Sequence, residues 1–331
     1  VRNFLYDKKL LRSVSFGLPV IGIGNLSVGG TGKSPMAEYL AGMLKNKFRI
    51  AILSRGYKRK TRGYSLAHER STALEIGDEP MQFHLKFPEI PIAVGEKRVE
   101  AIPQLLHDHP GTEAILLDDA FQHRRIKAGL DILLTDRGNL FTRDFYLPTG
   151  DLRDQKRSYR RADMIIVTKC SPSLNEIEKE KITKEITLLS NQSLFFSTIE
   201  YEEPYHIRTG QKNQIHEGME VLLVTGIANP KPLKSWVEEK SKVYYQLSFP
   251  DHHVFRIDDL RDIKNRFEQI RAENKIILTT EKDGVRLLKF KDELAELPLF
   301  VIPVRHRFLF GEEQRFDELV SGFIKNFKRK D

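Results

Sequence analysis

The sequence predicts an α/β protein, in which a doubly wound, mainly parallel sheet of the P-loop NTPase-like kind is followed by a second, smaller α/β domain. Three observations support this prediction. Short apolar runs alternate with helical patterns, as in βα units around a parallel sheet. A glycine-rich loop follows the first of these runs. The length of 331 residues suits about two domains, and 40% of the residues are apolar, which is enough for packed cores.

The first domain is predicted to span residues 19–200. Its apolar runs predict strands at residues 19–24, 49–54, 90–94, 114–117, 132–135 and 164–168. Helical patterns between and after them predict helices at residues 34–45, 79–86, 96–107 and 174–189. Buried strands with helices between them make one doubly wound domain.

Periodicity then fades, and residues 201–218 are polar and rich in turn formers, as expected for a linker. The pattern restarts in a second domain, residues 219–331, which we expect to close over the cleft. Strands are predicted at residues 221–225, 243–247, 276–279 and 299–304, and helices at residues 232–239 and 257–268. A final helix at residues 312–328 can pack on either domain, although the domain boundaries place it in the second.

Composition narrows the possible partners and compartment. Lys and Arg number 54 against 46 Asp and Glu, a net charge of +8 that favours anionic partners. Cys170 is the only cysteine, which rules out an intramolecular disulfide and a cysteine-built zinc site and suits a reducing compartment. No apolar run is long enough to span a bilayer.

Residues 1–18 form a separate segment in which Phe and Leu alternate with Lys and Arg. This pattern is typical of a basic amphipathic helix at a membrane surface. An apolar stripe of this kind more often packs on a protein core, so from the pattern alone both interpretations stay open.

The strongest single motif is the glycine-rich loop directly before a predicted helix. It comprises Ser27, Val28, Gly29, Gly30, Thr31, Gly32, Lys33 and Ser34. Its backbone N–H groups can surround a polyphosphate, Lys33 can reach the β- and γ-phosphates, and the Ser34 hydroxyl can bind Mg²⁺. Ser27 stands where the strict pattern has glycine. The loop predicts an ATP and Mg²⁺ site, against the alternative of a glycine-rich turn with an incidental Lys-Ser pair.

A carboxylate pair supplies the acidic group that such a site needs. Asp118 and Asp119 end the apolar run at residues 114–117, and strands of an open α/β sheet end where ligands bind. Aspartate also ends strands simply because it favours turns. The Thr-Lys-Cys-Ser sequence at residues 168–171 lacks the carboxylate of a guanine-reading motif, which disfavours GTP.

Seven segments appear in a characteristic order and resemble the tetraacyldisaccharide 4′-kinase family, the lipid A 4′-kinases of Gram-negative bacteria. They are Gly-Asn-Leu-Ser-Val-Gly-Gly-Thr-Gly-Lys-Ser-Pro at 24–35, Leu-Ser-Arg-Gly-Tyr at 53–57, Gly-Asp-Glu-Pro at 77–80, Asp-Asp-Ala-Phe-Gln-His at 118–123, Leu-Pro-Thr-Gly-Asp-Leu-Arg at 147–153, Asp-His-His at 251–253 and Thr-Glu-Lys-Asp at 280–283. The resemblance therefore covers most of the chain, from residue 19 to residue 283.

The resemblance implies ATP-dependent phosphorylation of the 4′-hydroxyl of tetraacyldisaccharide 1-phosphate to give lipid IVA. The implied partners are this lipid and the cytoplasmic face of the bacterial inner membrane, to which the protein would bind peripherally, with no nucleic acid and no obligate protein partner. Two alternatives stay open from the residues alone. One is a membrane-associated P-loop ATPase that acts as a switch or partner-loading factor, and the other is charge-driven nucleic-acid binding.

The family resemblance also implies the catalytic base. It places the base at Asp78, with His252 from the second domain as its imidazole partner and closure around the linker bringing the two together. Without the resemblance, Asp78 can equally be a helix cap, and His252 can belong to an exposed turn.

The remaining site residues follow from the same resemblance. Glu79, Asp118 and Asp119 are the implied Mg²⁺ partners beside Ser34. The implied substrate-binding residues are Arg55, Arg98 and His123. The two arginines are candidates to bind phosphate, of the nucleotide or of the substrate, or can be ordinary surface arginines. His123 follows the carboxylate pair closely enough to support it.

Overall fold

The computed structural model describes residues 2–328 and divides into two compact units. The large unit contains residues 1–200 and 305–331, and the small unit contains residues 201–304. Residue 1 of the expected N-terminal segment and residues 329–331 of the expected second domain lie outside the described residues.

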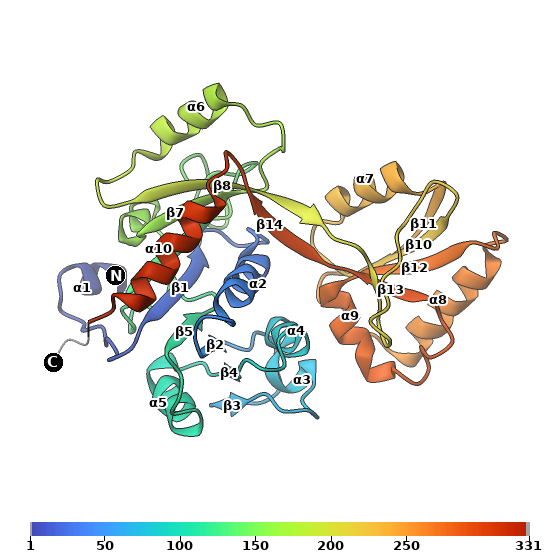
Figure 1. Cartoon of the computed structure of the whole chain (residues 1–331), viewed down its shortest axis with the longest axis horizontal. Coiled ribbons are helices and arrows are strands. Elements are labelled where there is room, and N and C mark those ends of the chain that lie inside the picture. The colour runs from blue at the N-terminus through green and yellow to red at the C-terminus, as the bar shows by residue number, and fades with distance from the viewer. Residues whose placement is uncertain (1, 329–331) are drawn as a thin grey trace. The chain divides into compact units, whose positions relative to one another are not determined.

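A nine-stranded sheet in the order β14-β8-β7-β6-β1-β5-β2-β4-β3 forms the centre of the large unit (Figure 1). The strands are β1 (Val20–Asn25), β2 (Ile50–Ser54), β3 (Ser65–Leu66), β4 (Ile92–Val94), β5 (Ala114–Leu117), β6 (Leu130–Asp136), β7 (Met164–Thr168), β8 (Ser193–Tyr201) and β14 (Val304–Phe308). Neighbours from β4 to β8 pair in parallel, whereas β3 pairs antiparallel with β4. The mainly parallel sheet that the sequence predicted is confirmed.

Helices cover both faces of this sheet. They are α1 (Arg2–Asp7), α2 (Lys33–Leu44), α3 (Ala73–Ile76), α4 (Asp78–Lys86), α5 (Arg98–Asp108), α6 (Glu176–Ile186), α10 (Glu313–Lys325) and the 3₁₀ helix η1 (Lys156–Arg161). Successive strand residues point to opposite faces. Thus Leu116 packs in a core with Met36 of α2 and Phe316 of α10, whereas Leu117 packs with Ile102 of α5. The sheet is therefore doubly wound.

β14 and α10 belong to a different domain from the one that the sequence predicted for them. The sequence placed all residues after 218 in the second domain, yet residues 305–331 belong to the large unit. The apolar face of α10, with Phe316 and Val320, completes the core of the large unit. The expected strand at 299–304 is in fact two strands, because Pro303 lacks the N–H that would continue the ladder.

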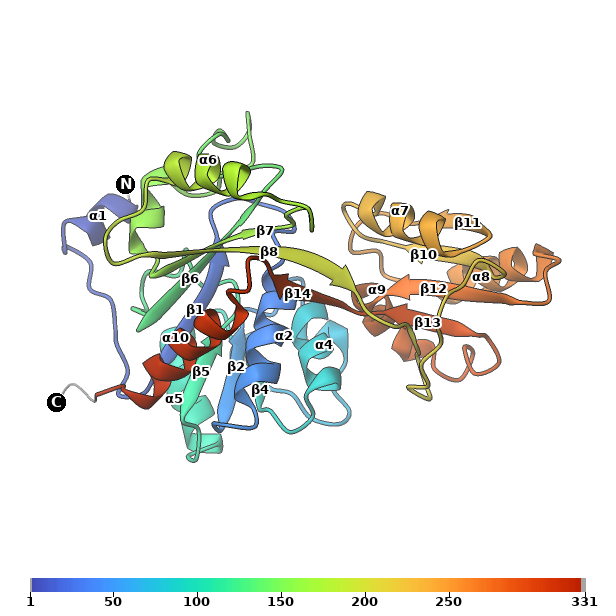
Figure 2. The same cartoon turned by 45° about the horizontal axis from the view of Figure 1, so that its top comes forward.

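The small unit contains a five-stranded sheet in the order β11-β10-β12-β13-β9 (Figure 2). Its elements are β9 (Tyr205–His206), β10 (Glu220–Thr225), α7 (Lys231–Lys240), β11 (Val243–Ser248), α8 (Ile257–Gln269), β12 (Lys275–Thr280), α9 (Glu281–Leu287), the 3₁₀ helix η2 (Leu288–Phe290) and β13 (Leu299–Ile302). Only β9 runs antiparallel to its neighbour. The expected linker thus contains a strand of this sheet, because β9 pairs with β13.

The N-terminal segment is helical over α1 only, which is shorter than the amphipathic helix expected over residues 1–18. Phe4 is 50% exposed and Leu10 is 69% exposed, whereas Tyr6 is buried. The segment is joined to the large unit by an ion pair of 2.6 Å between Arg124 and Asp7. Within residues 2–328, no helix has the length and apolar character needed to cross a membrane.

Candidate functional site

The glycine-rich loop connects β1 to α2 at the carboxyl edge of the large sheet. Gly29 and Gly32 have φ angles of 94° and 86°, in the left-handed region that glycine adopts without steric cost. The helix α2 begins at Lys33, directly after Gly32. The loop therefore leads into the positive end of a helix, where backbone N–H groups are suited to bind an anion.

Side chains from neighbouring strands hold the loop in place. Asn25, the last residue of β1, donates from its side-chain amide to the Thr31 hydroxyl at 2.9 Å. The Thr168 hydroxyl at the end of β7 donates to the Thr31 carbonyl, also at 2.9 Å. On the other side, the Val28 N–H donates to the Asp151 carbonyl at 2.7 Å. These contacts fix the loop shape without a ligand.

Two cations converge on Asp119 beside the loop. The Lys33 ammonium lies 3.6 Å from the Asp119 carboxylate and 3.3 Å from the Asn25 side-chain oxygen. The Arg153 guanidinium binds both oxygens of Asp119, at 3.1 Å for one of them, and also contacts Asn25 at 2.6 Å. Sequence reasoning did not select Asn25 or Arg153, although both lie in segments that carry the family resemblance. Lys33 and Arg153 are therefore two cations beside the loop, of the kind that binds phosphate oxygens.

The two carboxylates of the pair have different environments. Asp118 is buried and accepts a hydrogen bond of 3.1 Å from the Ser54 hydroxyl. Burial, with the nearby charges of Asp119 and Glu79, raises the pKa of Asp118 to about 6. Burial also opposes ionisation of Asp119, but Lys33 and Arg153 outweigh it and lower the pKa of that group.

These acidic groups are the candidates to hold Mg²⁺. Within residues 2–328, no cluster of three or more His, Cys, Asp or Glu side chains has the spacing of a metal site. The chemistry of the donors nevertheless fits a hard cation, which prefers carboxylate oxygens. The negative charges of Asp119 and Glu79 both raise the pKa of the buried Asp118, and a divalent cation among the three would relieve this repulsion.

The predicted substrate-binding residues occupy three different environments. Arg98 is only 2% exposed, and its guanidinium donates to the backbone carbonyls of Asp118 at 2.9 Å and Asp119 at 3.4 Å. Arg98 therefore holds the backbone of the carboxylate pair in place. Arg55 is exposed in the turn after β2, and His123 is partly buried in the turn after the pair. Their roles in substrate binding stay predictions.

Asp78 and Glu79 form the first turn of α4, directly after Gly77. Gly77 has a φ of 97°, and a Cβ added there would lie 3.2 Å from the Gly56 Cα and from the Tyr57 carbonyl oxygen. Glycine is therefore required for the close contact between the Gly-Asp-Glu-Pro turn and the Arg-Gly-Tyr turn that follows β2. This contact places the start of α4 at the edge where the strands end.

The side chain of Glu38 links α2 to α4. Its carboxylate accepts a hydrogen bond of 2.7 Å from Gln82 and forms an ion pair of 2.7 Å with Lys86. Glu38 lies on α2, and its two partners lie on α4. Because the two helices begin with the loop lysine and with Asp78, this link fixes the spacing of groups that would act on one phosphate.

His252 belongs to the small unit, in the loop after β11. Arg286 donates to its Nδ1 atom at 3.1 Å and to the Asp283 carboxylate at 3.0 Å. Asp283 in turn accepts from the Gly226 N–H at 2.9 Å. A guanidinium can only donate, so Nδ1 is the acceptor and the ring proton of the neutral imidazole lies on Nε2. Asp283 of the Thr-Glu-Lys-Asp segment therefore holds Arg286, and Arg286 sets the tautomer of His252.

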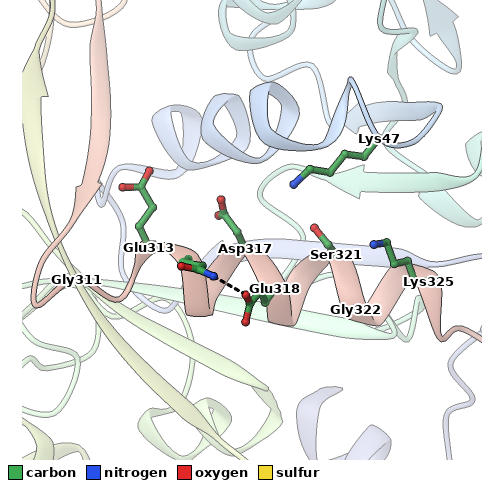
Figure 3. Close-up of a pocket in the computed structure, with 9 residues that line it drawn as sticks. Lys47, Gly311, Glu313, Asp317, Glu318, Ser321, Gly322 and Lys325 are labelled. Atoms are coloured by element: carbon green, nitrogen blue, oxygen red, sulfur yellow. Dashed lines mark hydrogen bonds between the residues drawn. The ribbon is translucent and has the colours of Figure 1, made fainter.

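A surface hollow of about 740 Å³ lies along α10, where Figure 3 shows Asp317 and Ser321 on the side of the helix that faces Lys47. Its lining residues are Lys47, Gly311, Glu313, Gln314, Asp317, Glu318, Ser321, Gly322 and Lys325. None of them belongs to the glycine-rich loop or the carboxylate pair. Asp317 accepts a hydrogen bond of 2.8 Å from Tyr39, so this carboxylate links α10 to α2.

Comparison with known proteins gives a match over almost the whole chain. The family model described as Tetraacyldisaccharide-1-P 4'-kinase matches residues 1–325. A tetraacyldisaccharide 4′-kinase of Bacteroides thetaiotaomicron is 43% identical, over 99% of this chain and 90% of that protein. A tetraacyldisaccharide 4′-kinase of Flavobacterium johnsoniae is 44% identical, over 98% of this chain and 93% of that protein. A crystal structure of LpxK from Aquifex aeolicus in complex with ATP is similar with a TM-score of 0.75 and 27% identity, covering 98% of this chain and 94% of that one.

Proposed function

The chain belongs to the tetraacyldisaccharide-1-P 4′-kinase family, and from this premise we propose how its residues perform the reaction. It is an ATP-dependent kinase of lipid A biosynthesis that phosphorylates the 4′-hydroxyl of tetraacyldisaccharide 1-phosphate. We propose that the glycine-rich loop binds the triphosphate of ATP, with Lys33 and Arg153 neutralising its charge. The convergence of both cations on Asp119, beside the loop, is the observation that carries the proposal.

We propose that Mg²⁺ is held by Ser34, Glu79, Asp118 and Asp119. Ser34 lies in the first turn of α2, and the charge of Glu79 acts on the buried Asp118. When bound, Mg²⁺ neutralises charge on the phosphates of the nucleotide. The chain's contribution is to hold the carboxylates in place, through Ser54 on the side chain of Asp118 and through Arg98 on its backbone.

Asp78 is the proposed general base, which accepts the proton of the 4′-hydroxyl as phosphoryl transfer proceeds. In this proposal His252 directs its Nε2–H to the Asp78 carboxylate, which orients that carboxylate toward the sugar. The proposal is supported by the tautomer that Arg286 imposes on His252, which leaves the ring proton on Nε2. Because the two residues belong to different units, we propose that closure around the linker brings them together for the reaction, as the family resemblance implies.

The proposed location is the cytoplasmic face of the inner membrane, bound peripherally. Support comes from the exposed Phe4 and Leu10 in a segment that also carries Lys8, Lys9 and Arg12. Apolar side chains among basic ones suit an anionic membrane surface. Arg55 and His123 are retained as candidates for substrate contacts. Arg98, the third predicted substrate-binding residue, is proposed to act through the carboxylate pair that it holds.

We expect the purified protein to transfer the γ-phosphate of ATP to tetraacyldisaccharide 1-phosphate in detergent micelles. Mass spectrometry of the lipid should show the gain of one phosphate group, and a chelator of Mg²⁺ should abolish it. A parallel measurement of ATP hydrolysis without lipid tests the alternative of an ATPase switch. A folded protein that hydrolyses ATP but leaves the lipid mass unchanged would refute the kinase assignment.

The Arg286→Met variant is expected to lower kcat roughly tenfold, since one hydrogen bond of about 1.4 kcal/mol fixes the tautomer of His252. The KM for ATP should not change. Arg261→Met is the control for loss of an arginine that pairs with an aspartate three residues earlier, at an exposed position of α8. In a His252→Ala background the Arg286 substitution should have no further effect on kcat. A full tenfold loss in that background would show that Arg286 does not act through His252.

A further inference from the structure

His306 lies on β14 and is buried against the glycine-rich loop, with 2% of its surface exposed. Its Nε2 atom is 2.9 Å from the Gly32 carbonyl oxygen, and its Nδ1 atom is 2.9 Å from the Ser197 hydroxyl on β8. Both ring nitrogens therefore have a partner inside the large unit. No motif in the sequence singles out this histidine, because it lies far from the loop along the chain.

The partners define which nitrogen carries the proton. A carbonyl oxygen can only accept, so Nε2–H donates to Gly32, and Nδ1 accepts from the Ser197 hydroxyl. Burial lowers the pKa of His306 to about 4, so the ring is neutral at physiological pH. A neutral ring in this tautomer satisfies both contacts without a buried charge.

The hydrogen bond to Gly32 has a consequence for the phosphate site. The Gly32 carbonyl and the Lys33 N–H belong to one planar trans peptide and point in opposite directions. Holding the carbonyl toward β14 therefore aims the Lys33 N–H away from β14, at the start of α2. Thr168 holds the Thr31 carbonyl at 2.9 Å in the same way and so aims the Gly32 N–H. These are N–H groups of a helix N-terminus, which have no acceptor within the helix.

Gly32 itself is packed against the ring. A Cβ at this position would lie 3.0 Å from the His306 Nε2 atom, and the φ of 86° disfavours other residues independently. The carbonyl of Gly32 also accepts the first hydrogen bond of α2, from the Met36 N–H at 3.1 Å. The imidazole therefore buttresses the peptide at which the loop becomes a helix.

We propose that His306 is a positioning residue for ATP: through the Gly32 carbonyl it presets the loop amides that receive the phosphates. It does not touch the nucleotide, and it acts on affinity for ATP rather than on the lipid substrate. Without the imidazole, the Gly32 carbonyl keeps the hydrogen bond from the Met36 N–H but loses its second donor, so the peptide between Gly32 and Lys33 is held less firmly and ATP binding has to restore its orientation.

The test compares His306→Phe, which keeps a ring but donates no hydrogen bond, with His306→Gln, whose amide can reach Gly32 as Nε2 does. Loss of one buried hydrogen bond predicts an ATP dissociation constant raised about tenfold in the Phe variant. The KM for the lipid should stay unchanged. The Gln variant should recover most of the ATP affinity, which a purely space-filling role for the ring would not produce.

Phe308→Leu is the matched control, since Phe308 lies two residues along on β14 and packs in the core on Phe316. It should lower the melting temperature and leave ATP affinity intact. If His306→Phe does not fold, Ser197→Ala provides the measurement, because it frees Nδ1 and should weaken ATP binding about threefold. Unchanged ATP affinity in the folded variants, or equal losses in His306→Phe and Phe308→Leu, would overturn the proposal.

Discussion

Asp78→Asn should lower kcat by roughly 10²–10⁴-fold, the range that a positioned general base contributes. The amide keeps the size of the side chain but cannot accept the proton of the 4′-hydroxyl. ATP affinity should stay near that of the unsubstituted protein, because the loop, Lys33 and Arg153 are intact. The measurement pairs lipid phosphorylation rates with ATP titration by calorimetry.

A matched control tests whether the loss comes from the helix terminus rather than from the base. Glu176 is the first residue of α6, as Asp78 is of α4, and it is exposed. Glu176→Gln therefore removes a carboxylate from the same helix position and should leave kcat unchanged. If Asp78→Asn weakened ATP binding as much as it lowered turnover, Asp78 would be a nucleotide-site residue and not the base.

The strands at the centre of the large sheet could be predicted from the sequence because they are continuously apolar. β1, β2, β5 and β7 are buried along their whole length, as parallel strands covered on both faces must be. β14 could not be found in this way. It is an edge strand with the sequence Val-Arg-His-Arg-Phe, in which charged residues interrupt the apolar run. Its place depends on pairing with β8, which no local pattern reveals.

The same limit applies to the site. The glycine-rich loop and the carboxylate pair are local patterns, and the structure places both at the carboxyl edge of one sheet. Arg153 reaches Asp119 from 34 positions away along the chain, and His306 reaches Gly32 from 274 positions away. Such contacts follow from strand order rather than from spacing in the sequence. Arg153 lies in a segment that carries the family resemblance, whereas no sequence pattern indicates His306.

Lys33→Ala should affect both binding and turnover, in contrast to the change at Asp78. Lys33 is the loop lysine at the positive end of α2, and its ammonium is held by Asn25 and Asp119 beside the glycine-rich loop, where the triphosphate is proposed to bind. Removing a cation that stabilises a transferring phosphoryl group should lower kcat roughly 10²–10³-fold. ATP affinity should also fall, because the ground-state phosphates lose the same charge.

Lys45→Ala at the other end of α2 provides the control for this change. Lys45 forms an ion pair of 2.6 Å with Glu89, and neither residue belongs to the glycine-rich loop. Its loss should alter neither kcat nor ATP affinity, since an exposed pair contributes little. The two site substitutions then separate two roles: Asp78→Asn changes the rate alone, and Lys33→Ala changes the rate and the affinity. If Lys33→Ala bound ATP with full affinity, the phosphates of the nucleotide would not contact the loop lysine, and the proposed nucleotide site would be wrong.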